Sequence, residues 1–377
     1  MSKKRVVRLP KGIGELIFPI CQKFFDGLGP KEIAEWVREE SKKQGKEVKL
    51  SRELVYPTLM EARRLGYIRF NPPPYIGLTR RVADFTRAPL DKVRVVNVTG
   101  PEGLDHVAAA ASELAFDLIA DLGIRKANAG TKRVEVHLGL GAGRTTMLVA
   151  RHLGARLRSV DRPEKVDKLV VHALSSGFSV EDPLTAPVAM FSYFSQASLP
   201  VEFVSLFSEA VVTCKQYEDI KKLPGVREGF AQADKIEIVI TSLASAESKT
   251  GLLNLAMSKM KPPRRSDEHP KPIGDVQFRP YSEKGPIRDD PKGLRAVTLF
   301  ELDDFVRMTQ KEGKYVILLS GPTEEGSTKC DALMPLLTNP LLRVWSHLCL
   351  DKPTAEAVVA AFPLQPTYTT PAGSSPG

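Results

Sequence analysis

The chain has 377 residues, of which 42% are hydrophobic and 26% are charged, with four cysteines and a formal net charge of +9. This length is sufficient for two domains, each with its own core. The cysteines are far apart, which excludes the spacing of metal-binding and redox motifs and predicts reduced thiols. No stretch resembles a secretory signal or a membrane span. We therefore expect a cytoplasmic protein that does not associate with a membrane.

The net positive charge lies at the N-terminus. Residues 1–90 carry 19 Lys and Arg against 10 Asp and Glu, whereas the rest of the chain is balanced. A basic module beside a neutral one is typical of a protein that reads a polyanion with one domain. A solubilising basic arm is the alternative, and such an arm would lack folding signals.

The basic segment has the folding signals of three helices. Apolar side chains follow a helical period over residues 13–25. A second helix starts with Pro30 in its first turn, and a third starts at Ser51, a good N-cap residue. A short extended piece, residues 67–71, follows the third helix. This order predicts a winged helix-turn-helix in residues 1–72.

In a winged helix-turn-helix the last helix enters the major groove with its N-terminal residues toward the base edges. We expect Arg52 and Tyr56 to face bases and the neighbouring basic residues to reach phosphates. The candidate DNA-binding residues are Lys46, Lys49, Ser51, Arg52, Tyr56, Arg63, Arg64 and Arg69. Pro57 removes one helical hydrogen bond, so the helix is either kinked there or begins after Ser51. A winged helix that binds protein instead of DNA is the alternative.

Residues 73–92 are basic and rich in proline, and they predict a linker. Over residues 93–362, strand-like runs alternate with helical stretches. The strand-like runs are 93–98, 133–138, 168–174, 201–207, 236–243, 315–320 and 344–350. Such alternation predicts a Rossmann-like α/β domain, whose ligands bind at the C-terminal ends of the strands. Residues 261–295 predict a hairpin with a mobile entry loop, and residues 363–377 predict a disordered tail.

A glycine-rich loop lies between a strand and a helix in the stretch VEVHLGLGAGRTTMLVARHLG, residues 134–154. It does not match the dinucleotide pattern, because its third glycine comes one residue early and no acidic residue follows the next strand. The P-loop pattern is also absent, since GPTEEGSTK places its lysine after the Ser-Thr pair. We therefore expect no cofactor. Two interpretations remain, an anion bound at the helix N-terminus and a tight turn without a ligand.

Several motifs follow one another in the order of a known family. They are FFDGLGPKEIAEWV, SRELVYPTLMEARRLGYI, GLGAGRTTMLVARHL, PIGDVQFRPYSEKG, KYVILLSGPTEEGSTKCDALMPLL and LCLDKPTAEAVV. Over about residues 12–361 the chain resembles SorC/DeoR-type bacterial transcriptional regulators. That resemblance implies a winged helix followed by a sugar-binding effector domain with a fold of the sugar-phosphate isomerase-like type.

The resemblance also implies a ligand site. Its effector-binding residues are Gly141, Gly143, Arg144, Thr145, Thr146, Asp275, Lys329 and Asp351. The expected function is a DNA-binding regulator, a homo-oligomeric dimer or tetramer, in which a sugar or sugar phosphate modulates binding to an operator. No metal site and no catalytic residue are expected.

Two other functions remain as alternatives. An isomerase- or deaminase-like enzyme would need a general base, for which Asp275 and Asp351 are candidates, while the six histidines form no cluster in the sequence. A regulator whose pocket has decayed would act as a scaffold.

Overall fold

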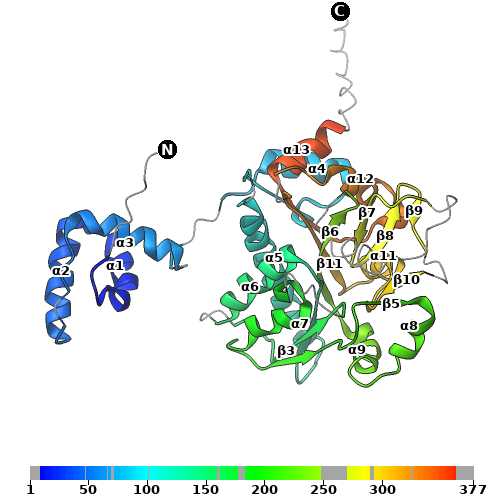
Figure 1. Ribbon diagram of the computed structural model, residues 1–377, viewed down its shortest axis with the longest axis horizontal. Helices are drawn as coiled ribbons and strands as arrows, with labels where there is room; N and C mark the ends of the chain where they lie inside the picture. The colour runs from blue at the N-terminus through cyan, green and yellow to red at the C-terminus, as the bar shows by residue number, and fades with distance from the viewer. Residues whose placement is uncertain are drawn as a thin grey trace, which may run out of the picture. The chain divides into compact units, whose positions relative to one another are not determined.

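The computed structural model describes residues 9–46, 48–65, 67–68, 72–100, 102–158, 162–176, 183–247, 270–288, 293–323 and 326–361. The chain divides into two compact units, Met1–Asn71 and Pro72–Gly377 (Figure 1). Each unit has its own hydrophobic core, as an independently folding domain requires.

The first unit is helical. Its elements are η1 (Ile13–Leu16), α1 (Ile17–Phe25), α2 (Pro30–Lys43) and α3 (Arg52–Arg64). Its core includes Ile20, Ile33 and Val55, none of which is exposed. The three predicted helices are present. Two apolar residues at the ends of these helices, Phe25 and Leu65, are 65% and 45% exposed.

Helix α3 begins at Arg52, directly after Ser51, and contains Pro57. The alternative that the helix starts later is therefore wrong. Pro57 has no N–H to donate to the carbonyl of Glu53. The Glu53 side chain is 68% exposed, so water reaches this first turn and limits the cost. The predicted wing at residues 67–71 falls largely outside the described residues, since only 67 and 68 are described, and they form a bend.

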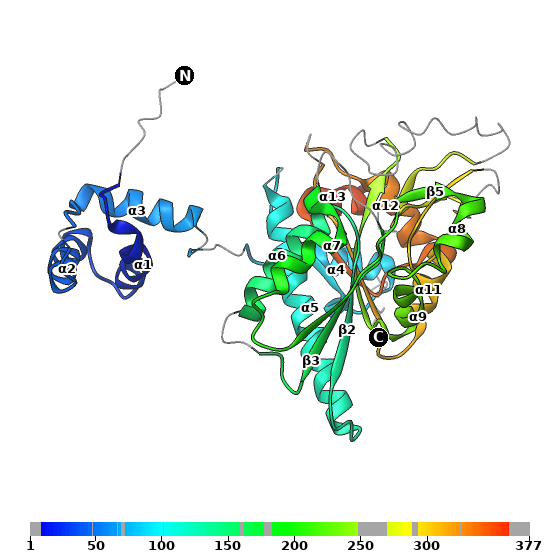
Figure 2. The ribbon, with the colours of Figure 1, turned by 60° about the horizontal axis from the view of Figure 1, so that its bottom comes forward.

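The second unit is built on a twisted sheet (Figure 2). Seven strands run parallel in the order β1-β12-β11-β6-β2-β3-β4. Their bounds are β1 Val93–Val96, β2 Glu135–Leu140, β3 Lys168–Ala173, β4 Val201–Val204, β6 Ile238–Ser245, β11 Tyr315–Ser320 and β12 His347–Asp351. Each strand overlaps one of the seven predicted runs, because buried parallel strands read as continuous apolar runs, and β2, β6 and β12 extend beyond the predicted ends.

Helices cover both faces of the sheet (Figures 1 and 2). Helices α5 and α6 pack on one face, and α4, α11, α12 and α13 pack on the other. The helices of this unit are α4 Ile76–Thr86, α5 Gly103–Asn128, α6 Arg144–Arg158, α7 Pro187–Met190, α8 Cys214–Ile220, α9 Arg227–Gln232, α11 Leu302–Gln310, α12 Cys330–Thr338 and α13 Lys352–Ala361. Short 3-10 turns are η2 Leu90–Lys92, η3 Pro183–Thr185, η4 Phe191–Phe194, η5 Ala233–Lys235 and η6 Pro340–Leu342. The α/β fold class is as predicted.

The stretch 73–92 is not a linker. It contains helix α4, whose buried face packs against α13 and β1 and adds Leu78, Val82 and Ala83 to the core of the second unit. The tertiary partner, and not the local sequence, stabilises this helix. Residues 72–90 thus belong to the second unit together with their three basic residues, and the first unit itself carries 16 Lys and Arg against 9 Asp and Glu.

A hairpin extends the sheet beyond β6. Its strands are β7 (Gly274–Val276), β8 (Arg279–Ser282) and β9 (Gly285–Pro286), and β7 pairs antiparallel with the C-terminal end of β6. The hairpin predicted for this region is present, and its entry loop lies outside the described residues. A separate two-stranded sheet, which the sequence did not predict, joins β5 (Val211–Thr213) to β10 (Leu294–Ala296).

The predicted tail at 363–377 lies outside the described residues. In the part of the chain that is described, no helix combines the length and the apolar character needed to cross a membrane. All four cysteines are free.

Candidate functional site

Parallel strands bring the expected effector residues to one edge of the sheet. Strands β12, β11, β6 and β2 are neighbours, and their C-terminal ends lie at this edge. Gly141 follows β2, Asp351 ends β12, and Lys329 precedes α12, the helix that follows β11. Asp275 in β7 pairs with Ala244 near the end of β6. Residues from four separate motifs are thus gathered beside one another.

Backbone hydrogen bonds hold the glycine loop. The N–H of Gly141 donates to the carbonyl of Ile240 at 3.0 Å, and the N–H of Gly143 donates to the carbonyl of Thr185 at 2.9 Å. Gly143 has a φ of 115°, a conformation that favours glycine. In the first turn of α6, the N–H of Met147 donates to the carbonyl of Gly143 at 3.0 Å. The N–H groups of Thr145 and Thr146 lie at the helix N-terminus, where the helix itself provides no acceptor, and they face a ligand bound there.

The first turn of α6 also presents two buried hydroxyl groups. Thr145 is 5% exposed and Thr146 is not exposed. The Oγ1 of Thr146 has no hydrogen-bond partner among the described residues. Arg144, in contrast, is exposed to solvent, so the two threonines and not the arginine form the buried side of the loop.

Asp275, Lys329 and Asp351 form an electrostatic group. The Nζ of Lys329 donates to the carbonyl of Leu243 at 3.2 Å, and both aspartates favour its charged form. Burial nevertheless lowers the pKa of Lys329 and raises the pKa of Asp351. Burial also raises the pKa of Asp275 to about 7, although part of the residue remains accessible to solvent. The N–H of Phe278, which donates to its Oδ1 at 3.1 Å, opposes this shift.

Buried polar atoms without partners gather at the same edge. Within the described part of the chain they include Thr146 Oγ1, Gln277 Oε1 and Ser320 Oγ. The Asp351 carboxylate and Thr354 Oγ1 have no partner among the described residues beyond their own local contacts with each other and with the adjacent backbone. Each such group costs about 1–3 kcal/mol relative to a paired one. Native proteins contain few of them, and water, an ion or a ligand commonly completes them. This edge therefore offers unmatched donors and acceptors to a polar ligand.

Three of these residues were not predicted to be site residues. Ser320 is a polar residue at the end of an apolar strand, and Thr354 lies in the quoted motif DKPTA, so both had a local signal. Gln277 had none, because its position depends on the hairpin that carries it.

Two histidines pair inside the sheet, which the sequence did not predict. The Nδ1 of His137 on β2 lies 2.9 Å from the Nε2 of His172 on β3. Burial lowers the pKa of His172 to about 3 and also lowers the pKa of His137, so both rings favour the uncharged form at neutral pH. Among the described residues, no group of three or more His, Cys, Asp or Glu is arranged to hold a metal ion.

In the first unit, helix α3 presents an exposed face. Arg52 and Tyr56 lie four positions apart, on the same side of the helix. The Arg52 side chain is 74% exposed and its Nε donates to Glu53 at 3.0 Å, while Tyr56 is 57% exposed. The N-terminal end of α3 is thus accessible to a partner, as a recognition helix requires.

The other candidate DNA-binding residues differ in their surroundings. Lys46 forms an ion pair with Glu15 at 2.5 Å and must leave it to reach a phosphate. Lys49, Ser51 and Arg63 are exposed. The side chain of Arg64 and the whole of Arg69 lie outside what the structure describes.

Comparison with known proteins gives the fold. No protein-family model and no curated protein sequence matches the chain. Similar solved structures are a probable sor operon regulator from Shigella flexneri (TM-score 0.53, 12% identity, 75% of this chain and 98% of that one) and a DeoR family transcriptional regulator from Listeria monocytogenes (TM-score 0.52, 12% identity, the same coverage). The full-length sorbitol operon regulator SorC from Klebsiella pneumoniae aligns over 92% of this chain and 98% of its own (TM-score 0.50, 12% identity). The chain therefore has the fold of the SorC/DeoR-type regulators.

Proposed function

We propose that this protein is a DNA-binding transcriptional regulator whose second unit binds a sugar or sugar phosphate and thereby modulates its affinity for an operator. The observation that carries this proposal is the group of buried polar atoms without partners at the C-terminal edge of the sheet. A fold that kept these atoms only for stability would have paired or replaced them, because each one destabilises the free protein.

The two ends of a sugar phosphate match different parts of this edge. The phosphate suits the N-terminus of α6, where backbone N–H groups and the helix dipole favour an anion, together with the Lys329 ammonium group. The hydroxyl groups suit the Asp351 carboxylate, which is fully buried and whose local contacts with Thr354 leave acceptor capacity for further donors. A ligand of this kind supplies both the negative charge and the donors that the site lacks.

The first unit supplies the DNA contacts in this proposal. It holds +7 of the net charge of +9 and an exposed N-terminal end of α3. Solved structures of the same fold include transcriptional regulators, which agrees with this role. We further propose that the protein acts in the cytoplasm as a homo-oligomer, since two copies related by symmetry match the two halves of a palindromic site.

The test is a titration of the DNA-bound protein with glucose 6-phosphate, fructose 6-phosphate and ribose 5-phosphate. We expect at least one of them to change DNA affinity by about 5- to 150-fold, the usual range of allosteric coupling. Lys329→Ala and Thr145→Ala should abolish this response and leave DNA binding without ligand intact. Lys311→Ala, which removes an exposed lysine of the same unit, is the matched control and should respond as the wild type does. Binding of DNA that no sugar phosphate alters would contradict the sensing role.

An enzyme that converts a sugar phosphate is the second candidate. The specific observation in its favour is Asp275, since a carboxyl group with a pKa of about 7 is suited to act as a general base near neutral pH. Incubating the protein with the same three compounds and following them by NMR separates the two functions. Conversion that is lost in Asp275→Asn would favour the enzyme, and binding without conversion would favour the regulator.

A further inference from the structure

The turn between β7 and β8 has an unusual backbone. Its two central residues, Gln277 and Phe278, have φ values of 52° and 61°. A two-residue hairpin turn with both φ values positive is normally made by Asn and Gly, since other side chains are strained there. Strain of this kind persists where the surrounding structure enforces it, and it is common at functional sites.

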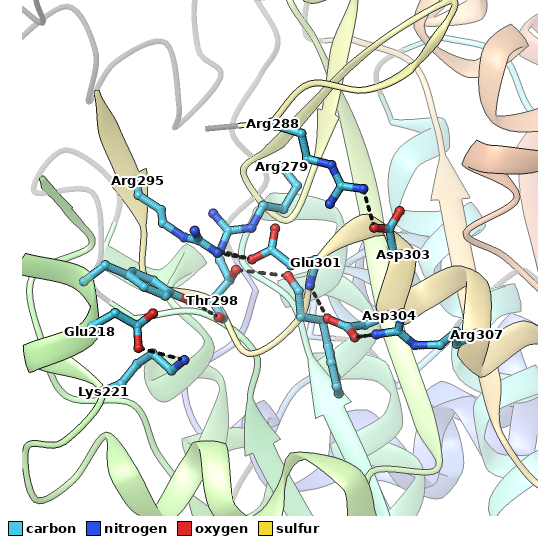
Figure 3. A network of polar contacts seen from close by, with 12 residues as sticks. Glu218, Lys221, Arg279, Arg288, Arg295, Thr298, Glu301, Asp303, Asp304 and Arg307 are labelled. Carbon is cyan, nitrogen blue, oxygen red and sulfur yellow. Dashed lines mark hydrogen bonds and ion pairs between the residues drawn. The ribbon is translucent and has the colours of Figure 1, made fainter. Parts of the chain in front are cut away.

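Charged contacts hold the hairpin in place. Arg279, the residue after the turn, is 3% exposed and lies 2.9 Å from the carboxylate of Glu301. Arg295 of β10 bonds to the same carboxylate and stacks on the ring of Tyr217 at 4.0 Å. Figure 3 shows the two guanidinium groups pointing from separate strands toward Glu301. These contacts, together with the bond from the Phe278 N–H to Asp275, fix the direction in which Gln277 points.

The Gln277 side chain occupies the space over the glycine loop. A Cβ atom added to Gly141 would lie 1.8 Å from the Nε2 of Gln277. The absence of a side chain at position 141 therefore serves the approach of this amide. The sequence suggested that the glycines admit a ligand to the backbone, but at Gly141 the group that approaches is part of the protein.

The hydrogen bonds determine which way the amide is turned. Its Nε2 donates to the Oγ1 of Thr241 at 2.7 Å. The Thr241 hydroxyl in turn donates to the carbonyl of Ser242 at 3.3 Å, so its oxygen accepts from Gln277. The Oε1 of Gln277 is left buried, with no hydrogen-bond partner in the described residues. What the site lacks at this point is a donor.

We propose that Gln277 is a specificity-determining residue whose Oε1 accepts a hydrogen bond from a hydroxyl group of the bound sugar. This inference rests on the proposed function and assigns an orientation to the ligand. The phosphate group of a sugar phosphate has a second pKa of about 6, so at neutral pH it is mainly a dianion whose oxygens only accept. It therefore cannot satisfy Oε1, and the phosphate lies away from Gln277. The hydroxyl-bearing end of the ligand lies against the hairpin turn.

The test compares variants of the full chain by isothermal titration calorimetry, with inorganic phosphate and the three sugar phosphates named above as probes. Gln277→Met removes the acceptor and keeps the length of the side chain. We expect it to bind the sugar phosphate about tenfold more weakly, as the loss of one hydrogen bond predicts, and to bind inorganic phosphate as the wild type does. Gln277→Gly also lacks the acceptor, relieves the strained turn, and should show the same pattern, which guards against misfolding as the cause.

Phe278→Gly is the matched control. It relieves the same turn and keeps both the Gln277 amide and the backbone N–H at position 278, so it should bind both probes as the wild type does. Sugar-phosphate binding that is unchanged in both Gln277 variants would overturn the role of Gln277 and leave the sensor intact. An equal loss of inorganic phosphate would place the phosphate at Gln277 and also overturn the inference. A wild type that binds none of the sugar phosphates would overturn the proposed function itself.

Discussion

Replacing Asp275 by Asn tests whether the candidate site is maintained at a cost to stability. Burial raises the pKa of this carboxyl from 3.8 to about 7. The folded chain therefore binds this proton more tightly than the unfolded chain, and folding takes up a proton between about pH 4 and pH 7. As the pH rises through this window, the free energy of unfolding contributed by Asp275 falls. Below pH 4 the group is protonated in both states and the cost disappears.

The size of the effect follows from the shift. A shift of about three pKa units corresponds to about 4 kcal/mol, at 1.36 kcal/mol per unit. This shift already includes the attraction to Lys329. Partial access of solvent to Asp275 reduces the figure, so we expect about 1–4 kcal/mol. The Asn side chain keeps an oxygen that accepts from the Phe278 N–H. Asp275→Asn should therefore be more stable than the wild type at pH 8, by an amount that vanishes toward pH 4.

Urea denaturation followed by tryptophan fluorescence measures this difference. Trp345 is 1% exposed and lies in the same unit as Asp275. A Trp36→Phe background removes the tryptophan of the other unit, so that the signal reports one unfolding transition. Asp219→Asn, at an exposed position, is the control and should show no comparable trend. A stability difference for Asp275→Asn that does not change between pH 4 and pH 8, or a less stable variant at pH 8, would refute the reasoning.

Three further predictions concern packing, DNA and the ligand site. Gly154→Ala should lower the free energy of unfolding by about 1–3 kcal/mol, because the added Cβ would lie 2.3 Å from the backbone carbonyl oxygen of Tyr193. Gly77→Ala should raise it by about 0.5–1 kcal/mol, because Gly77 lies in helix α4 with room for a methyl group. Urea denaturation measures both, and equal effects would contradict the assignment. Arg52→Ala should reduce the discrimination between DNA selected from a random library and unselected DNA by about 1–3 kcal/mol. Lys49→Ala should weaken binding to selected and unselected DNA equally and lower the salt dependence of binding. Filter binding at several salt concentrations distinguishes these outcomes. Thr146→Val should raise the free energy of unfolding of the ligand-free protein by about 1–3 kcal/mol, because it removes a buried hydroxyl that has no partner in the described residues, and it should weaken sugar-phosphate binding in calorimetry. A loss of stability would show that the hydroxyl is structural.

Much of the secondary structure was determined by the sequence alone. The seven parallel strands fall in apolar runs, and the helices of the first unit follow an apolar period of 3.6 residues. These signals are local, because the spacing of apolar residues along each element reflects which of its faces are buried. The helix at α4 and the strands β5 and β10 escaped prediction. Helix α4 lies next to a proline-rich stretch and is stabilised by packing against α13, and the two strands have three residues each.

Only the tertiary structure decided how the site is assembled. The sequence contains Gly141, Asp275, Lys329 and Asp351 as separate motifs, and parallel pairing of the strands brings them to one edge. The role of Gln277 has no local signal, because the space over Gly141 exists only after the hairpin has paired with β6. Local periodicity records which face of an element is buried. Contacts between distant segments, and the charges and unpaired atoms that they bury together, depend on how those elements pack.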